Sequence, residues 1–485
     1  MSPHPETVLA IDIGTSGARA ALITSNGLAI SSAQMHYGFQ QDNLTGAAEM
    51  DAELVLSGVL EVINRCTAGQ RTSVRCVTVA AAMHSLVLLD ERGRPLTPLS
   101  IWMDTRATTQ CEQYREMYEH EHWHQKTGCI LSPSIPLARL LWYREKEPEL
   151  FRRFSKAVSI KSYTLMQLAG ACVEDHSVAA GSGLLNVQLR KWASEVLDYI
   201  DLDPIRLPAL ADTQDVVYHG QPKGVRMEGV ANDTVWLAGG ADGPLAHRAS
   251  TGKSSNSASL TIGTSSAARR SAVDSMRKRD KAVWCYPLDS HRYVVGQASN
   301  NGGTVIDWCM RTLFPASTLL ADLDVALRDR SSDPALLFIP FLHPERDCLV
   351  EQRPAAGFTG LQSEHVPLDL FQAALEGVVF NSINMLERLG PPDPSIPPVA
   401  SGGVMRLDAV RRILSAVIPG IRRLPEGVDA TLMGAAGLGW EYLGVNQEIV
   451  LKDAMSMEDA AGGEAYRQKY KIWKEKAAAP TRTVE

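Results

Sequence analysis

The chain has 485 residues, more than one hydrophobic core usually supports, so its length predicts two domains. With 45% hydrophobic and 21% charged residues, its composition is typical of a water-soluble globular protein. The formal net charge of −7 argues against a nucleic-acid-binding surface, and an anionic substrate would need a local group of cations.

Cysteine spacing and hydropathy indicate a cytoplasmic protein without a membrane segment. No two cysteines have a metal-ligand spacing, so we expect small hydrophobic side chains in a reducing compartment. The first seven residues lack the features of a signal peptide, and the longest nearly apolar run, 77–89, is too short to span a bilayer. The cysteines are Cys66, Cys76, Cys111, Cys129, Cys172, Cys285, Cys309 and Cys348.

The first predicted element is a β-hairpin around a glycine-rich turn. Residues 8–13 and 19–23 are short, apolar and β-prone, and Gly14-Thr15-Ser16-Gly17 separates them. Asp12 is a lone carboxylate in a strand expected to be buried, which favours a bound cation. The amides and hydroxyls of the turn suit an anion such as phosphate. A core hairpin with an ordinary turn and a capped Asp12 would explain the same residues.

Two candidate contacts to a polyol follow later strands of the first half. His84 comes after a buried strand at 74–80, and Asp104 comes just after a strand at 99–102. Polar residues at strand ends are where α/β proteins usually place ligands. The alternatives are a hydrogen-bonded core histidine and an Asp104 that caps the next helix. Other predicted helices of this half lie at 54–63, with Asp51 as the candidate cap, and at 137–143, 159–168 and 192–199.

A helix is predicted over 106–124, and three histidines lie near its end. Only His120 and His124 share a helical face, because His122 is two residues from each. No further metal ligand follows nearby, so the pattern favours a solvated helix end over a metal site.

Asp242 stands where an apolar strand beginning at Val235 and a Gly-Gly turn lead into a helix. A carboxylate there can act as a general base at a crevice between two halves, because the Ser-, Thr- and Gly-rich stretch 250–259 is typical of a linker. The other interpretation is an N-cap, which is common at such positions.

Residues 259–269 repeat the first hairpin. Ile262-Gly263-Thr264-Ser265 matches Ile13-Gly14-Thr15-Ser16, but Thr261 replaces the acidic residue before the glycine. Two such hairpins indicate two related domains that face one nucleotide. The first would hold the metal ion and terminal phosphate, and the second the inner phosphates.

The rest of the second half alternates strands, helices and glycine-rich loops. Small residues at Gly402, Gly403 and 434–437 allow a flat ring to approach the backbone, although close helix packing would explain them equally well. The predicted elements are a loop at 297–302 leading into a helix, strands at 336–342 and 399–400, and helices at 371–389, 409–417 and from 434.

Five segments, in this order along the chain, resemble the FGGY carbohydrate kinases, whose two domains share an actin-like, ribonuclease-H-like ATPase core. The resemblance implies an α/β fold of two such domains, 1–249 and 250–485, with an interdomain active-site cleft. The segments are IDIGTSGARA (11–20), MHSLVLLDERGRPLTPLSIWMDTR (83–106), GGADG (239–243), SLTIGTSS (259–266), and SGG (401–403) followed by DATLMGAA (429–436).

The family's use of these motifs implies ATP and Mg²⁺ as cofactors. It implies that Asp12 and Asp242 lie at the metal, that Asp242 is the catalytic base, and that Met83, His84 and Asp104 contact the sugar. Within the nucleotide site, Thr15 and Ser16 would lie at the γ-phosphate, Gly263 and Thr264 at the inner phosphates, and Gly402 and Gly403 beside the adenosine. The implied nucleotide-binding residues are Gly14, Thr15, Ser16, Arg19, Gly263, Thr264, Gly302, Gly303, Gly402 and Gly403.

Three segments resemble gluconate kinases within the family: Met83 to Leu86, Ser182 to Asn186, and Asn300 to Gly303. They imply phosphorylation of a hydroxyl of a sugar acid or open-chain sugar, most of all gluconate. Xylulose or another ketose or polyol is the alternative acceptor. A different class, a weakly catalytic sugar and nucleotide sensor, would need neither Asp12 nor Asp242, so their presence favours an enzyme. A homodimer is compatible with either class.

Overall fold

The computed structural model describes the chain in two compact units. Unit 1 comprises Met1–Lys253, Ala272–Val294 and Asp429–Lys452, and unit 2 comprises Ser254–Ser271, Val295–Val428 and Asp453–Glu485. Two segments of the expected second domain, 272–294 and 429–452, therefore lie in unit 1. The described residues are 4–117, 120–223, 225–252, 254, 256–275, 280–328, 330–346, 353–390, 393, 395–445, 454–457 and 463–478.

The main sheet of unit 1 has the strand order β14-β15-β6-β1-β2-β3, with β16 also paired to β6. β1 and β2 form the predicted hairpin, β2 and β3 are also antiparallel, and β6 runs parallel to both β1 and β15. The strands are β1 (Glu6–Ile13), β2 (Gly17–Ile23), β3 (Ala29–His36), β6 (Ser73–Ala81), β14 (Val216–His219), β15 (Val230–Leu237) and β16 (Gly240–Ala241).

Shorter strands and ten helices complete the described part of unit 1. The strands are β4 (Gln40–Asp42), β5 (Ala47–Met50), β7 (Val87–Leu89), β8 (Leu99–Ser100), β9 (Lys156–Val158), β10 (Val173–Asp175), β11 (Leu185–Asn186), β12 (Lys191–Trp192), β13 (Ala209–Ala211) and β19 (Trp284–Pro287). The helices are α1 (Ala52–Thr67), α2 (Thr108–Met117), α3 (His120–Thr127), α4 (Pro136–Lys146), α5 (Pro148–Arg153), α6 (Ile160–Ala169), α7 (His176–Ala180), α8 (Ser194–Ile200), α9 (Asp242–Thr251) and α14 (Ala430–Tyr442).

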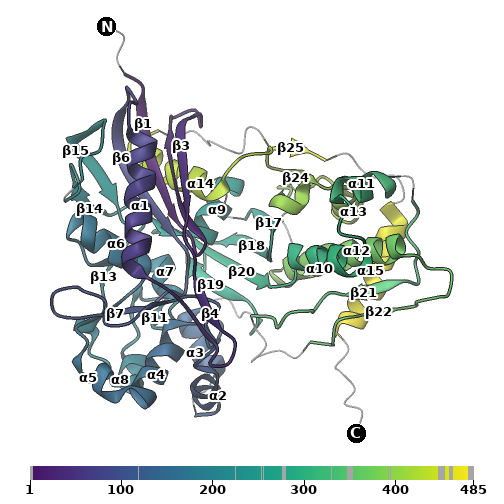
Figure 1. Ribbon diagram of the computed structural model, residues 1–485, viewed down its shortest axis with the longest axis horizontal. Helices are drawn as coiled ribbons and strands as arrows, with labels where there is room; N and C mark the ends of the chain where they lie inside the picture. The colour runs from purple at the N-terminus through teal and green to yellow at the C-terminus, as the bar shows by residue number, and fades with distance from the viewer. Residues whose placement is uncertain are drawn as a thin grey trace. The chain divides into compact units, whose positions relative to one another are not determined.

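The two faces of β1 pack against different helices (Figure 1). Leu9, Ile11 and Ile13 share one hydrophobic core with Val55 and other apolar residues of α1, which starts after the predicted cap Asp51. Alternate residues of a strand point to opposite faces, so Val8 and Asp12 face the other side. On that side Gly439 of α14 lies so close to Val8 that an added Cβ would meet the Val8 side chain at 2.8 Å. The face carrying Asp12 is thus covered by α14.

Unit 2 is built on a sheet with the order β20-β18-β17-β23-β24-β25. β17 and β18 form the second predicted hairpin, and β23 runs parallel to β17. The strands are β17 (Ala258–Ile262), β18 (Ser266–Ala272), β20 (Tyr293–Ser299), β21 (Leu337–Ile339), β22 (Gly357–Thr359), β23 (Val399–Ser401), β24 (Arg422–Arg423) and β25 (Met455–Ser456). The helices are α10 (Gly303–Leu313), α11 (Leu320–Ala326), α12 (Pro367–Arg388), α13 (Asp408–Val417) and α15 (Gly463–Ala478).

Several predicted elements need correction. The strand expected at 99–102 ends at Ser100, and the helix expected over 106–124 is described as two helices, α2 and α3. His124 is not at a solvated helix end, because the residue is 2% exposed and its Nε2 donates to the Val283 carbonyl at 2.9 Å. That bond also leaves Nε2 unsuited to a metal ion. The side chain of His120 lies outside the described residues.

The described cysteines and helices bear on two of the sequence-based expectations. The described cysteines are free thiols, mostly buried, as expected for small hydrophobic side chains; Cys348 lies outside the described residues. Among the described helices, none has both the length and the apolar character needed to cross a bilayer.

Candidate active site

The first hairpin places Asp12 at its buried end. The turn is tight: the Gly14 amide donates to the Gly17 carbonyl at 2.9 Å, and a Cβ on Gly17 would meet the Met35 carbonyl oxygen at 2.3 Å. Gly17 is therefore required by the approach of β3. Thr15 and Ser16 are at least partly exposed at the tip, and the Trp102 indole donates to the Thr15 hydroxyl at 3.5 Å.

Arg19 joins Asp12 to Asp429. Asp12 and Arg19 are cross-strand partners in the hairpin, and the Arg19 guanidinium forms ion pairs with both carboxylates. Asp429 is the N-cap of α14 and accepts from the amides of Thr431 and Leu432, each at 3.1 Å. The positive end of α14 and Arg19 thus hold Asp429 beside the hairpin. The sequence assigned Arg19 to the nucleotide, which stays a prediction.

The Asp12 carboxylate is buried and only partly hydrogen-bonded. The residue is 2% exposed, and within the described part of the chain its Oδ1 has no hydrogen-bond partner. Burial raises the pKa of Asp12 from 3.8 to about 7, although the charge of Arg19 acts in the opposite direction. The negative charges of Asp242 and Asp429 add to the increase. The positive charge of Arg19 therefore does not balance the negative charge of the three carboxylates, so the site favours an additional cation.

Asp242 lies close enough to Asp12 to affect its ionisation. It is half-buried and is the first residue of α9, where its Oδ1 accepts from the Gly243 amide at 2.7 Å. The N-cap interpretation is wrong, because Ala241 occupies the N-cap position. The short strand β16 pairs with β6 and fixes the start of α9 next to the sheet that carries Asp12.

Met83 and His84 follow β6 in a strained turn. His84 has a φ of 66°, a left-handed conformation that is uncommon outside glycine and is enriched at functional sites. Its Nδ1 donates to the Gly181 carbonyl at 2.7 Å, which fixes the tautomer with Nδ1 protonated. A Cβ on Gly181 would meet the Met83 side chain at 2.4 Å. Met83 and His84, two of the three predicted sugar contacts, thus lie against Gly181, directly before the segment from Ser182 to Asn186.

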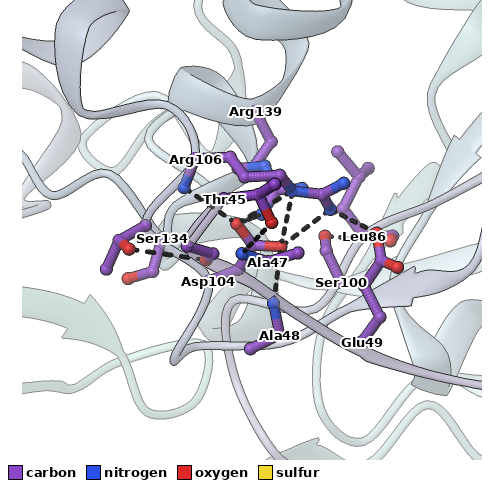
Figure 2. Close-up of polar contacts among 12 residues, drawn as sticks. Thr45, Ala47, Ala48, Glu49, Leu86, Ser100, Asp104, Arg106, Ser134 and Arg139 are labelled. Carbon is purple, nitrogen blue, oxygen red and sulfur yellow. Dashed lines mark hydrogen bonds and ion pairs between the residues drawn. The ribbon is translucent and has the colours of Figure 1, made fainter. Parts of the chain in front are cut away.

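Asp104 is buried among its own partners (Figure 2). Its side chain is 0% exposed; it accepts from the Ala48 amide at 3.2 Å and from Arg106 Nη2 at 2.8 Å, and it pairs with the buried Arg139. Burial by itself would raise the pKa of Asp104, but the hydrogen bonds from Arg106 and the charge of Arg139 outweigh it and lower the pKa. Asp104 holds two arginines in place, and a direct sugar contact stays a prediction.

The second hairpin brings together three glycine segments that are distant in sequence. The Gly303 amide donates to the Gly263 carbonyl at 2.7 Å, and a Cβ on Gly302 would meet the Ser265 carbonyl carbon at 2.7 Å. Gly402, with a φ of 104°, lies so close to Ile262 that a Cβ would meet its carbonyl oxygen at 2.3 Å. The predicted nucleotide-binding residues of unit 2 are therefore neighbours around one turn.

Of the small residues in unit 2 and α14, some serve close helix packing and others leave room for a flat ring. Gly434 lies inside α14, not at its start, and a Cβ there would meet the Leu245 carbonyl oxygen at 1.9 Å, so it serves packing against α9. Gly403 has open space around the position of a Cβ and can accept a ring against its backbone.

Sequence reasoning missed Asp429, Arg139 and Ser266. Asp429 had a usable signal, because an acidic residue directly before a helix predicts an N-cap, but its pairing with Arg19 has no local signature. Arg139 sits in an otherwise apolar helical stretch and is 0% exposed. Ser266 is 1% exposed, and its hydroxyl has no partner among the described residues.

Comparison with known proteins gives the same family as the motifs. Residues 7–247 match the N-terminal domain and residues 258–440 match the C-terminal domain of the FGGY family of carbohydrate kinases. A gluconokinase of Bacillus subtilis (strain 168) is 28% identical over 89% of this chain and 86% of its own. A xylulose kinase of Escherichia coli (strain K12) is 27% identical over 76% of each chain.

Solved structures confirm the predicted fold class. A gluconate kinase from Lactobacillus acidophilus has a TM-score of 0.87 and 27% identity, and a xylulose kinase from the same organism has 0.89 and 28%. Each comparison covers 97% of both chains. The two α/β units thus have the actin-like ATPase fold, and because the matching domains span most of the sequence, the chain belongs to the FGGY family of carbohydrate kinases.

Proposed function

We propose that this protein transfers the γ-phosphoryl group of ATP to a hydroxyl of a sugar acid, with gluconate as the preferred acceptor. The observation that carries the proposal is the acidic group at the first hairpin, where Asp12 and Asp242 lie beside a turn suited to phosphate. Phosphoryl transfer needs neutralised phosphate charge, positioned reactants and an acceptor for the hydroxyl proton. A protein that only bound sugar and nucleotide would need neither carboxylate.

The residues present fit a magnesium ion. Asp12 has a buried oxygen without a partner among the described residues, and such an atom is costly unless a ligand satisfies it. Mg²⁺ commonly takes one or two carboxylates together with phosphate oxygens and water, and Asp12 and Asp242 would hold it. When bound, the ion neutralises negative charge on the phosphates. Arg19 keeps the Asp12 side chain oriented by pairing with its other oxygen.

The remaining residues have distinct roles in this proposal. Asp242 accepts the proton of the acceptor hydroxyl, and the turn containing Thr15 and Ser16 binds the terminal phosphate. In unit 2, the turn of the second hairpin binds the inner phosphates, and the open backbone at Gly403 accepts the adenine or ribose ring. Met83 and His84 contact the sugar.

Gluconate is favoured by sequence similarity, and xylulose is the second candidate. The gluconokinase of Bacillus subtilis is 28% identical over 449 residues, and the segments around Met83, Ser182 and Asn300 resemble gluconate kinases. In support of xylulose, the xylulose kinase from Lactobacillus acidophilus has a TM-score of 0.89.

ADP release with Mg-ATP over a panel of gluconate, D-xylulose, glycerol and related sugar acids tests the proposal. We expect the highest kcat/KM for gluconate, because a site that hydrogen-bonds particular groups rejects analogues lacking them by roughly 10⁴-fold or more. A higher kcat/KM for xylulose would make the acceptor wrong and leave the kinase activity standing. Sugar binding without turnover of any acceptor would favour the sensor class. Cell fractionation and light scattering test the predicted cytoplasmic location and homodimer.

A further inference from the structure

Within unit 2, the turn of the second hairpin carries polar groups that lack partners among the described residues, and we call this turn with the adjoining start of α10 the cradle. Among the residues that the structure describes, none accepts a hydrogen bond from the amides of Thr264 or Ser265. Ser266 is 1% exposed, and its hydroxyl has no partner in the described part of the chain. That hydroxyl lies close to Gly302, because a Cβ on Gly302 would be 2.9 Å from it. Gly302 is the N-cap of α10, and the Gly303 and Thr304 amides of this eleven-residue helix donate to the Gly263 and Thr264 carbonyls, which fixes the turn against the positive end of the helix.

Arg346 places a guanidinium beside this turn. Its Nε donates to Asn300 Oδ1 at 3.0 Å, and its Nη2 donates to the Ser265 hydroxyl at 3.5 Å. Asn300 belongs to the loop that leads into α10, so Arg346 bridges the hairpin turn and the helix start. The other described groups of the cradle are backbone amides and hydroxyls, which are neutral, and Arg346 adds a positive charge beside them.

A buried hydrogen-bond network fixes the residues directly before Arg346. Glu345 is 6% exposed and accepts from the Ser299 hydroxyl at 2.7 Å and from Asn301 Nδ2 at 2.6 Å. The Asn301 side-chain oxygen in turn accepts from the His343 amide at 2.8 Å. Satisfied buried polar networks of this kind restrict conformation, so the guanidinium is oriented before a ligand arrives.

We infer that Arg346 is a phosphate-binding residue of the nucleotide site, contacting the inner phosphates of a nucleoside diphosphate or triphosphate. The inference rests on the proposed function, because it assumes that the second hairpin holds a nucleotide. A guanidinium is planar and can donate two parallel hydrogen bonds to phosphate oxygens, which a lysine cannot reproduce. The amides and hydroxyls of the turn supply direction, and Arg346 supplies the charge.

Calorimetric titration of ADP and of adenosine, without sugar, tests this role in Arg346→Gln and Arg346→Lys. We expect ADP binding to weaken roughly 10- to 100-fold in Arg346→Gln, because a lost charge-assisted hydrogen bond is of that size. Adenosine binding should remain unchanged, because adenosine carries no phosphate, and Arg346→Lys should recover part of the loss. Arg311→Gln, which removes an exposed arginine from the same helix α10, is the matched control and should bind both ligands normally.

The outcomes separate this inference from the proposed function. If wild-type protein binds neither ADP nor ATP, both are wrong. If wild type binds ADP and Arg346→Gln binds it equally well, the inference is wrong and the nucleotide site remains. Equal loss of ADP and adenosine binding would assign Arg346 to loop structure instead of phosphate contact and would also overturn the inference.

Discussion

Replacement of Asp12 by asparagine tests the charge state of the acidic group through stability. Burial raises the pKa of Asp12 from 3.8 to about 7, and a shift of about three units corresponds to about 4 kcal/mol. The folded-state pKa lies above the unfolded-state value. The contribution of protonated Asp12 to the unfolding free energy is therefore fully present at pH values below the unfolded-state pKa. It is lost as the pH rises through the folded pKa near 7. Asparagine does not titrate, so the variant avoids this loss.

We therefore expect the unfolding free energy of Asp12→Asn, relative to that of wild type, to rise by about 2–3 kcal/mol from pH 5 to pH 8. Urea unfolding of both proteins at pH 5 and pH 8, without Mg²⁺ or nucleotide, measures this difference in unfolding free energy. The pH-dependent contributions of all other titratable groups are the same in the two proteins and cancel. Asp233→Asn, an exposed position in the same sheet, is the matched control and should show no such change. An identical pH dependence for Asp12→Asn and wild type would refute the argument from burial. Full activity of the variant at ordinary Mg²⁺ would remove Asp12 as a metal ligand.

Three further tests are independent of one another. Asp242→Asn should lower kcat by roughly 10²–10⁴-fold with little effect on sugar affinity, and near-wild-type turnover would remove it as the general base. Gly302→Ala should weaken ADP binding, because a Cβ there would meet the hairpin backbone at 2.7 Å. Gly403→Ala should leave thermal stability unchanged, because a Cβ there would meet no other atom. Lys469→Met should destabilise unit 2 by about 3–5 kcal/mol in urea unfolding, because it leaves the buried Glu376 without its ion-pair partner. Adding Glu376→Leu should restore most of the lost stability.

Local patterns were sufficient to predict the elements that carry the site. Short apolar runs around a glycine turn predicted the first hairpin, their repeat predicted the second, and Asp51 before an apolar helical repeat predicted the start of α1. These features depend on neighbours in sequence, because strand and helix periodicity and capping act over a few residues. The same locality explains the error at His124, whose burial comes from the Val283 segment far along the chain.

The partners of the site residues were decided by tertiary structure. Asp12 faces α14 because of the register of β1, and this places it with Asp429, which lies more than 400 positions away and meets it through Arg19. Asp104 follows a strand as predicted, yet Arg139 from α4 and the Ala48 amide enclose it. Periodicity determines which face a residue occupies. What covers that face depends on which distant helix can bury the most apolar surface there, and the sequence pattern of one element does not contain that information.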